Sequence, residues 1–151
     1  MRTLPSNFSR KAFTLIEVLI VVVILAILAS IVIFAVNPAR QIAQANNAQR
    51  DNDVKAILDA VYQYTVDNRG DYPVVILTDP TVIGSDSGSI DLCPALVPDY
   101  LTAMPFDPDQ EDGGYVDCAD YNTGYTIFLN GARLTVSAPL AELSDVISVT
   151  R

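Results

Sequence analysis

Residues 13–36 read FTLIEVLIVVVILAILASIVIFAV, and only Thr14, Glu17 and Ser30 interrupt this apolar run. Twenty-four helical residues rise roughly 36 Å, which exceeds the ~30 Å hydrocarbon core of a bilayer. Val and Ile favour strands in water, but in lipid the backbone must satisfy its own hydrogen bonds, so a helix is expected. The run therefore predicts a single transmembrane helix.

The charge of the chain changes along its length. Residues 1–12 carry three basic groups and no acidic group, whereas residues 51–151 carry 4 basic and 17 acidic groups. Because basic flanks stay cytoplasmic, we expect the acidic C-terminal part outside the cytoplasmic (inner) membrane. The alternative is a secretory signal peptide, whose apolar core would be only about 7–15 residues long. Ala43 and Ala45 could then mimic a weak cleavage site.

The composition excludes several classes of function. The 151 residues fit one modest domain. Histidine is absent, which excludes a Ser-His-Asp triad and a His-ligated metal, and two cysteines cannot build a four-Cys site. At a net charge of −9 we expect no direct nucleic-acid binding. No nucleotide-binding glycine loop or nucleophile elbow is found, so no enzyme is predicted.

The segment at the start of the apolar run carries a recognisable motif. Residues 10–17, RKAFTLIE, with the helix that follows, resemble the N-terminus of type IV prepilins and type II secretion pseudopilins. In that family a membrane peptidase cuts after the basic leader and N-methylates the new first residue. The resemblance implies a cut between Ala12 and Phe13, where the family usually has Gly instead of Ala12. It also implies that Glu17 pairs with the Phe13 ammonium of a neighbouring subunit, since a buried cation needs a carboxylate.

The resemblance continues in looser patterns over most of the chain. It implies a filament subunit whose partners are copies of itself, the prepilin peptidase, an assembly platform, minor pilins and, before assembly, membrane lipid. Two alternatives stay open: a minor pilin that primes assembly, and a membrane-anchored binding protein that never polymerises. The sequence does not separate a pilus from a secretion pseudopilus. The stretches that carry the similarity are residues 64–73, 99–101, 104–108, 124–127 and 134–139.

Helical periodicity returns after the membrane run. At Asn37-Pro38 either a new helix begins or one long helix is kinked. Residues 41–53 lack a strong apolar face, so we expect a weakly held helix there. Gly70 is expected at the C′ position that ends the helix. Apolar positions then share one face at Val54, Ile57, Leu58, Val61, Tyr62 and Thr65.

The C-terminal part alternates in the manner of strands. Asn130-Gly131 lies between the candidate strands 125–129 and 132–138, which predicts a hairpin. Residues 146–150 can add a strand, and residues 72–77 are a further candidate, although Pro73 favours an edge or an extended loop. Residues 78–124 are expected to form a long structured loop.

The predicted fold class is therefore α+β and pilin-like, with a long N-terminal helix packed on a small antiparallel sheet of three to four strands. The expected organisation is a leader (1–12), a transmembrane or filament-core helix (13–36), an amphipathic helical half (37–70) and a loop-and-sheet domain (71–151).

Two further sets of residues are candidate sites. Cys93 and Cys118 lie on the predicted outer side, where a disulfide persists, although two buried free thiols are the alternative. Acidic residues crowd one loop beside Gly113-Gly114 and could hold Ca²⁺, as major pseudopilins do in a C-terminal loop, or could form a solvated acidic loop. These acidic residues are Asp107, Asp109, Glu111, Asp112, Asp117 and Asp120.

Overall fold

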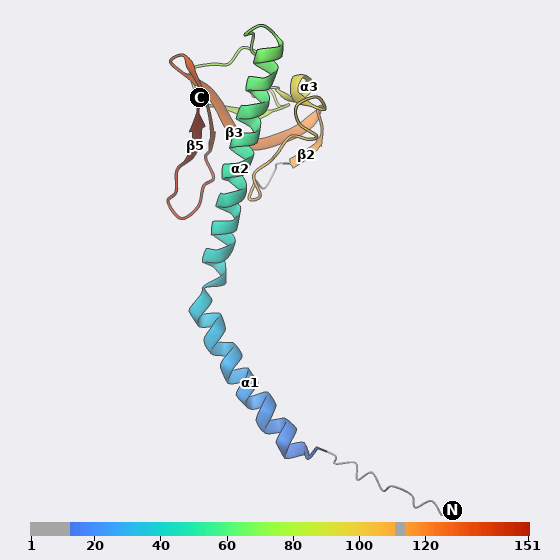
Figure 1. The fold of residues 1–151 in the computed structure, drawn as a ribbon, viewed down its shortest axis with the longest axis vertical. Helices are drawn as coiled ribbons and strands as arrows, with labels where there is room; N and C mark the ends of the chain where they lie inside the picture. Colours follow the sequence, from blue (N-terminus) through green and yellow to red (C-terminus); the bar gives the residue numbers. More distant parts are fainter. Residues whose placement is uncertain (1–12, 111–113) are drawn as a thin grey trace, which may run out of the picture. The chain divides into compact units, whose positions relative to one another are not determined.

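The computed structural model describes residues 13–110 and 114–151 (Figure 1). Helix α1 spans Leu15–Val36 and helix α2 spans Pro38–Asp67, so the restart of the helix at Pro38 is confirmed. Asn37 between them has a left-handed φ of 45°. Pro is well suited to the first helical position because its missing N–H has no partner there. The chain divides into two compact units at this point, and the C-terminal unit runs from Ala39 to Arg151.

Helix α1 is exposed along its described length. Its side chains from Leu15 to Ile33 are exposed, although nearly all are apolar. Among the described residues, Leu15–Ile33 is the one helical stretch long and apolar enough to cross a membrane. Such a surface is stable only when lipid or other apolar helices cover it.

Helix α2 places the predicted stripe against the core. Val54, Ile57, Leu58 and Val61 are fully buried, and Tyr62 and Thr65 are half-buried, as the periodicity predicts. The helix ends one residue earlier than expected. Gly70 donates its N–H to the Thr65 carbonyl at 2.8 Å, and Arg69 takes the left-handed conformation with φ of 62°. Arg69 therefore occupies C′ and Gly70 C″ of a Schellman motif.

The helix expected at residues 41–53 is present, but the expectation that it is weakly held is wrong. This part of α2 buries Ala43, Asn47 and Arg50 in the C-terminal unit. The stretch has no apolar stripe because polar side chains, rather than hydrophobic ones, attach it.

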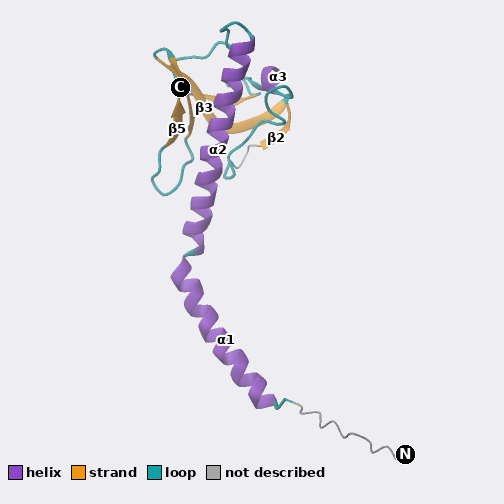
Figure 2. Cartoon of the chain, viewed as in Figure 1, coloured by secondary structure: helices purple, strands orange, loops and turns teal. Residues whose placement is uncertain are grey.

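In the part of the chain that the structure describes, the sheet has five strands, and each pair of neighbouring strands is antiparallel (Figure 2). Its order is β1-β3-β4-β5, and β2 pairs with β3 beside this path. A short helix, α3 (Cys93–Leu96), lies between β1 and β2. The strands are β1 (Thr81–Gly84), β2 (Gly114–Asp117), β3 (Asp120–Asn130), β4 (Arg133–Ala138) and β5 (Ile147–Thr150).

The class and the antiparallel sheet are confirmed, but the strand boundaries differ from the prediction. Strands β1 and β2 lie in the stretch expected to be loop, because four-residue strands leave little periodicity to detect. Residues 72–77 form no strand, so the alternative of an extended loop is confirmed. This loop contacts β3, where Leu129 donates its N–H to the Leu77 carbonyl at 2.8 Å. The hairpin turn is shifted by one residue, because Asn130 pairs with Arg133 and the two turn residues are Gly131 and Ala132.

One hydrophobic core joins α2 to the sheet. The α2 stripe packs with side chains of β1, β3, β4 and the loop around α3, and most of them are fully buried. Their burial supplies the main favourable free energy of this unit. The strand and loop contributions include Ile83, Leu92, Leu96, Tyr125, Ile127, Leu134 and Val136.

A disulfide joins Cys93, at the start of α3, to Cys118, in the turn between β2 and β3. The two Cα atoms are 5.3 Å apart, a usual separation for a disulfide. The bond closes a loop with a sequence separation of 25 residues. Cys93 and Cys118 thus form a disulfide and are not free thiols.

We expect the double variant Cys93→Ala/Cys118→Ala to have a free energy of unfolding about 3 kcal/mol lower than that of the wild type, because the unfolded chain regains the entropy of the open loop. Chemical denaturation of the full chain in detergent measures this difference. As a control, dithiothreitol should destabilise the wild type and leave the double variant unchanged. Equal stability of the oxidised wild type and the double variant would contradict the prediction.

Candidate functional site

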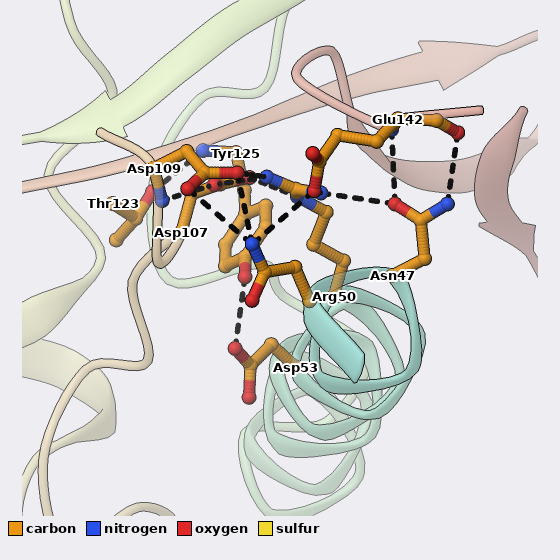
Figure 3. Close-up of polar contacts among 9 residues, drawn as sticks. Asn47, Arg50, Asp53, Asp107, Asp109, Thr123, Tyr125 and Glu142 are labelled. Carbon is orange, nitrogen blue, oxygen red and sulfur yellow. Dashed lines mark hydrogen bonds and ion pairs between the residues drawn. The ribbon is translucent and has the colours of Figure 1, made fainter. Parts of the chain in front are cut away.

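Arg50 of α2 is fully buried and points at two segments of the C-terminal unit (Figure 3). Its Nε donates to Asp107 Oδ2 at 2.8 Å, and its Nη2 donates to Asp107 Oδ1 at 2.9 Å. The Asp107 side chain is also fully buried. This two-pronged pairing of guanidinium with carboxylate is the strongest geometry available to the pair.

Two further carboxylates surround the same guanidinium. Nη2 donates to Asp109 Oδ2 at 2.7 Å, and Nη1 donates to Glu142 Oε2 at 3.0 Å. The side chains of Asp109 and Glu142 are 47% and 36% exposed. One positive charge therefore faces three negative charges, and the excess negative charge lies on the side that meets solvent.

Asn47 lies one helical turn before Arg50. Its side chain forms hydrogen bonds with the β4–β5 connection, which contains Glu142. Its Nδ2 donates to the Glu142 carbonyl at 2.9 Å, and its Oδ1 accepts the Glu142 N–H at 2.9 Å. The same Nδ2 donates to Asp145 Oδ2 at 2.9 Å, and Arg50 Nη1 donates to Asn47 Oδ1 at 2.9 Å. The Asn47 amide thus bonds the turn in the way that a neighbouring strand would.

The backbone of β3 holds Asp107 in place. The Asp107 N–H donates to the Thr123 carbonyl at 2.8 Å. Gly124 has a φ of +72°, and a Cβ there would lie 2.9 Å from Gln110 Oε1 and 3.1 Å from Asp107 Cβ. Glycine is needed at this position because the loop of Asp107 passes against the strand and the backbone is left-handed.

The electrostatics follow from this geometry. The hydrogen bonds that Arg50 donates to Asp107 raise the pKa of Arg50 above its usual value, although burial acts in the opposite direction. The hydrogen bond from Arg50 lowers the pKa of Asp109. Beside them, Tyr125 donates its hydroxyl to Asp53 Oδ2 at 2.8 Å, and burial raises the pKa of both groups.

This cluster fixes structure and offers no reactive group. Arg50 remains a cation, and the carboxylates around it accept hydrogen bonds. Among the described residues, no buried side-chain nitrogen or oxygen lacks a hydrogen-bond partner. The cluster therefore joins α2 to the 107–109 loop and to the turn between β4 and β5.

The residues predicted to bind Ca²⁺ fall into separate places. Asp107 and Asp109 pair with Arg50, while Asp117 accepts the N–H groups of Ala119 and Asp120 at 2.8 and 3.1 Å. Within residues 13–110 and 114–151, no group of three or more His, Cys, Asp or Glu is placed to hold a metal ion. Glu111 and Asp112 lie outside the described residues. Calcium binding stays a prediction.

The second candidate site is the start of α1. Thr14 is the N-cap, and its Oγ1 accepts the Glu17 N–H at 3.3 Å. The Glu17 carboxylate accepts the Thr14 N–H at 3.4 Å, which completes a capping box. The carboxylate thus lies at the positive end of the helix dipole, four residues after Phe13 in the sequence. Ala12 lies outside the described residues.

The comparison with protein families matches residues 7–33 to the prokaryotic N-terminal methylation motif, which is typical of type IV pilins and type II pseudopilins. No curated protein and no solved structure matches the chain.

The motif and the fold together define a class. A long N-terminal helical segment with an antiparallel sheet gives an α+β, pilin-like architecture. The chain is a prepilin-like protein, a class whose members are generally structural and non-enzymatic. The motif implies processing by prepilin peptidase and assembly with pilin partners, and with the apolar helix it indicates anchoring in the inner membrane before assembly.

The sequence pattern does not reveal the Arg50 cluster. Its one signal was an arginine inside an otherwise uncharged helical stretch, residues 41–50. The partners Asp107 and Glu142 are 57 and 92 residues away along the chain, so only the fold brings them to Arg50.

We expect Asp107→Asn to destabilise the chain by about 3–5 kcal/mol, because it leaves the buried Arg50 without its paired carboxylate. The matched control is Asp51→Asn, which breaks the exposed Lys55–Asp51 pair and should cost about 0.5 kcal/mol or less. Denaturation of both full-length variants in detergent gives the comparison. An Asp107→Asn effect no larger than the control would mean that the buried pair does not hold the unit together.

Proposed function

We propose that the chain is a structural subunit of a type IV pilus or a type II secretion pseudopilus. The observation that carries the proposal is the methylation motif at residues 7–33, which overlaps an apolar helix whose side chains from Leu15 to Ile33 are exposed. A helix of this kind needs lipid before assembly and other helices after it. A helical filament supplies those helices.

Processing would prepare the subunit for this exchange. In the proposed pathway the peptidase cuts between Ala12 and Phe13 and methylates Phe13. The cut removes Arg2, Arg10 and Lys11, the cations that keep the N-terminus on the cytoplasmic side. It also creates a new ammonium at the start of α1.

Glu17 is the proposed partner of that ammonium. Its carboxylate bonds the Thr14 N–H at 3.4 Å, which is long for a hydrogen bond. The bond can therefore be exchanged at little cost for a charged one. In the filament, Glu17 would accept the Phe13 ammonium of a neighbouring subunit, so that neither charge is buried alone.

Helix α1 would lose little hydrophobic stabilisation when it leaves the membrane for the filament. Its side chains would pass from lipid to apolar neighbours, so the hydrophobic cost of leaving the membrane is largely offset. An assembly platform and minor pilins are the proposed partners. The resemblance to major pseudopilins also carries the proposal that the acidic loop binds a Ca²⁺ ion.

Intact mass and N-terminal peptide mapping of the protein from its native membrane or filament fraction test the processing step. We expect a chain that begins at N-methylated Phe13. A chain that still begins at Met1, in cells with an active prepilin peptidase, would contradict the proposal and favour a membrane-anchored protein that does not polymerise.

The variant Glu17→Ala should insert and be cleaved normally, yet its filament yield should fall by about tenfold or more because the neighbouring ammonium stays unpaired. Ser30→Ala is the matched control, since Ser30 donates only to the Ile27 carbonyl of its own helix. Sedimented filaments are quantified against membrane-bound subunit. Wild-type yield from Glu17→Ala would remove Glu17 from the mechanism.

A further inference from the structure

A groove of about 340 Å³ opens beside the turn between β4 and β5. Asp145 is the one charged residue that lines it. Two hydroxyls, of Thr126 and Ser137, bond each other at 2.8 Å within the lining. Its remaining surface is largely apolar and includes Pro139, Ala141 and Val146.

The turn beside the groove has a strained backbone conformation. Leu143 and Ser144 both have left-handed backbones, with φ of 58° and 60°. Non-glycine residues adopt this conformation at a cost, so the surrounding structure must impose it. Here Asn47 and Arg50 impose it through their bonds to Glu142.

The strained turn presents apolar side chains and a carboxylate to solvent. Leu143 is 46% exposed and Val146 is 91% exposed. Asp145 uses Oδ2 to accept the Asn47 amide. A strained, firmly held turn with exposed apolar side chains has the properties of a contact surface.

The opposite end of β4 carries the complementary charge. Arg133 follows the hairpin turn, is exposed, and has no ion pair with any described residue. Leu77 lies beside this hairpin, bonded to Leu129, and is 51% exposed. One end of the sheet is therefore apolar and acidic, and the other end is apolar and basic.

We propose that the groove receives Arg133 of a second copy of this chain. Asp145 pairs with the guanidinium, the hydroxyls of Thr126 and Ser137 can accept its remaining N–H groups, and the aliphatic stem lies on Pro139 and Val146. The proposal rests on the proposed function, since it describes a contact between filament subunits.

The contact cannot form within one chain. Arg133 begins β4 and Ala138, which lines the groove, ends it. Six strand residues hold these ends roughly 17 Å apart. The groove and the arginine lie at opposite ends of each copy, which suits a head-to-tail contact; in the proposed helical filament such a contact repeats from copy to copy.

Cross-linking in isolated filaments tests the contact without removing the arginine. The double variant Ala132→Cys/Val146→Cys places one thiol at each end, and the native cysteines are already bonded to each other. A short bis-maleimide should produce a ladder of covalent multimers from the double variant. Each single variant should stay monomeric, because only one of the two facing positions carries a thiol.

Charge reversal gives a second, independent measurement. Arg133→Glu and Asp145→Arg should each lower filament yield about tenfold, and the combined variant should return it to within about twofold of wild type. The control is Arg69→Glu, an equal charge change at another exposed arginine, which should leave the yield unchanged.

The outcomes separate the two proposals. Filaments that form without a ladder and without charge-swap rescue overturn the contact and leave the filament function standing. Loss of yield in the Arg69→Glu control equal to that in Arg133→Glu also overturns it, since net charge alone would then explain the effect. A wild-type chain that is processed but never forms filaments overturns both.

Discussion

The C-terminal unit depends on one constraint: a guanidinium that is removed from water must be fully paired. Arg50 meets this demand with Asp107 in a two-pronged bond and with Asp109 and Glu142 at the rim. The cost of desolvating the cation makes any partial arrangement unfavourable. The positions of α2, the 107–109 loop and the β4–β5 turn are therefore fixed together.

Helix α1 and the C-terminal unit present different surfaces to their surroundings. In the C-terminal unit, the stripe Val54, Ile57, Leu58 and Val61 is buried by the sheet, so this unit suits water. Helix α1 has no such cover, and its backbone groups bond within the helix. It suits lipid or a bundle of like helices. A subunit that is first anchored in a membrane and then, as proposed, packed in a filament needs an apolar helix as well as a water-exposed domain.

The Arg50 cluster also connects the stability of the C-terminal unit to the proposed contact between two copies of the chain. It accounts for the left-handed turn at Leu143-Ser144, since the bonds to Glu142 hold the backbone there. That turn borders the groove in which we place a neighbour's arginine. The excess negative charge around Arg50 and Asp145 would attract a basic group and repel another acidic surface, which matters for a unit that carries many more acidic than basic residues.

The sequence by itself determined the features that arise from local pattern. These are the membrane-length helix, the buried stripe of α2, the hairpin near Asn130-Gly131, and the class of protein. Periodicity, caps and turns act over a few residues, so they can be seen in one stretch of chain. Only the tertiary structure decided strand β1 and the burial of Arg50, because these depend on partners dozens of residues away whose approach leaves no local pattern. Strand β2 pairs with nearby residues, but its four residues are too few to show a periodicity.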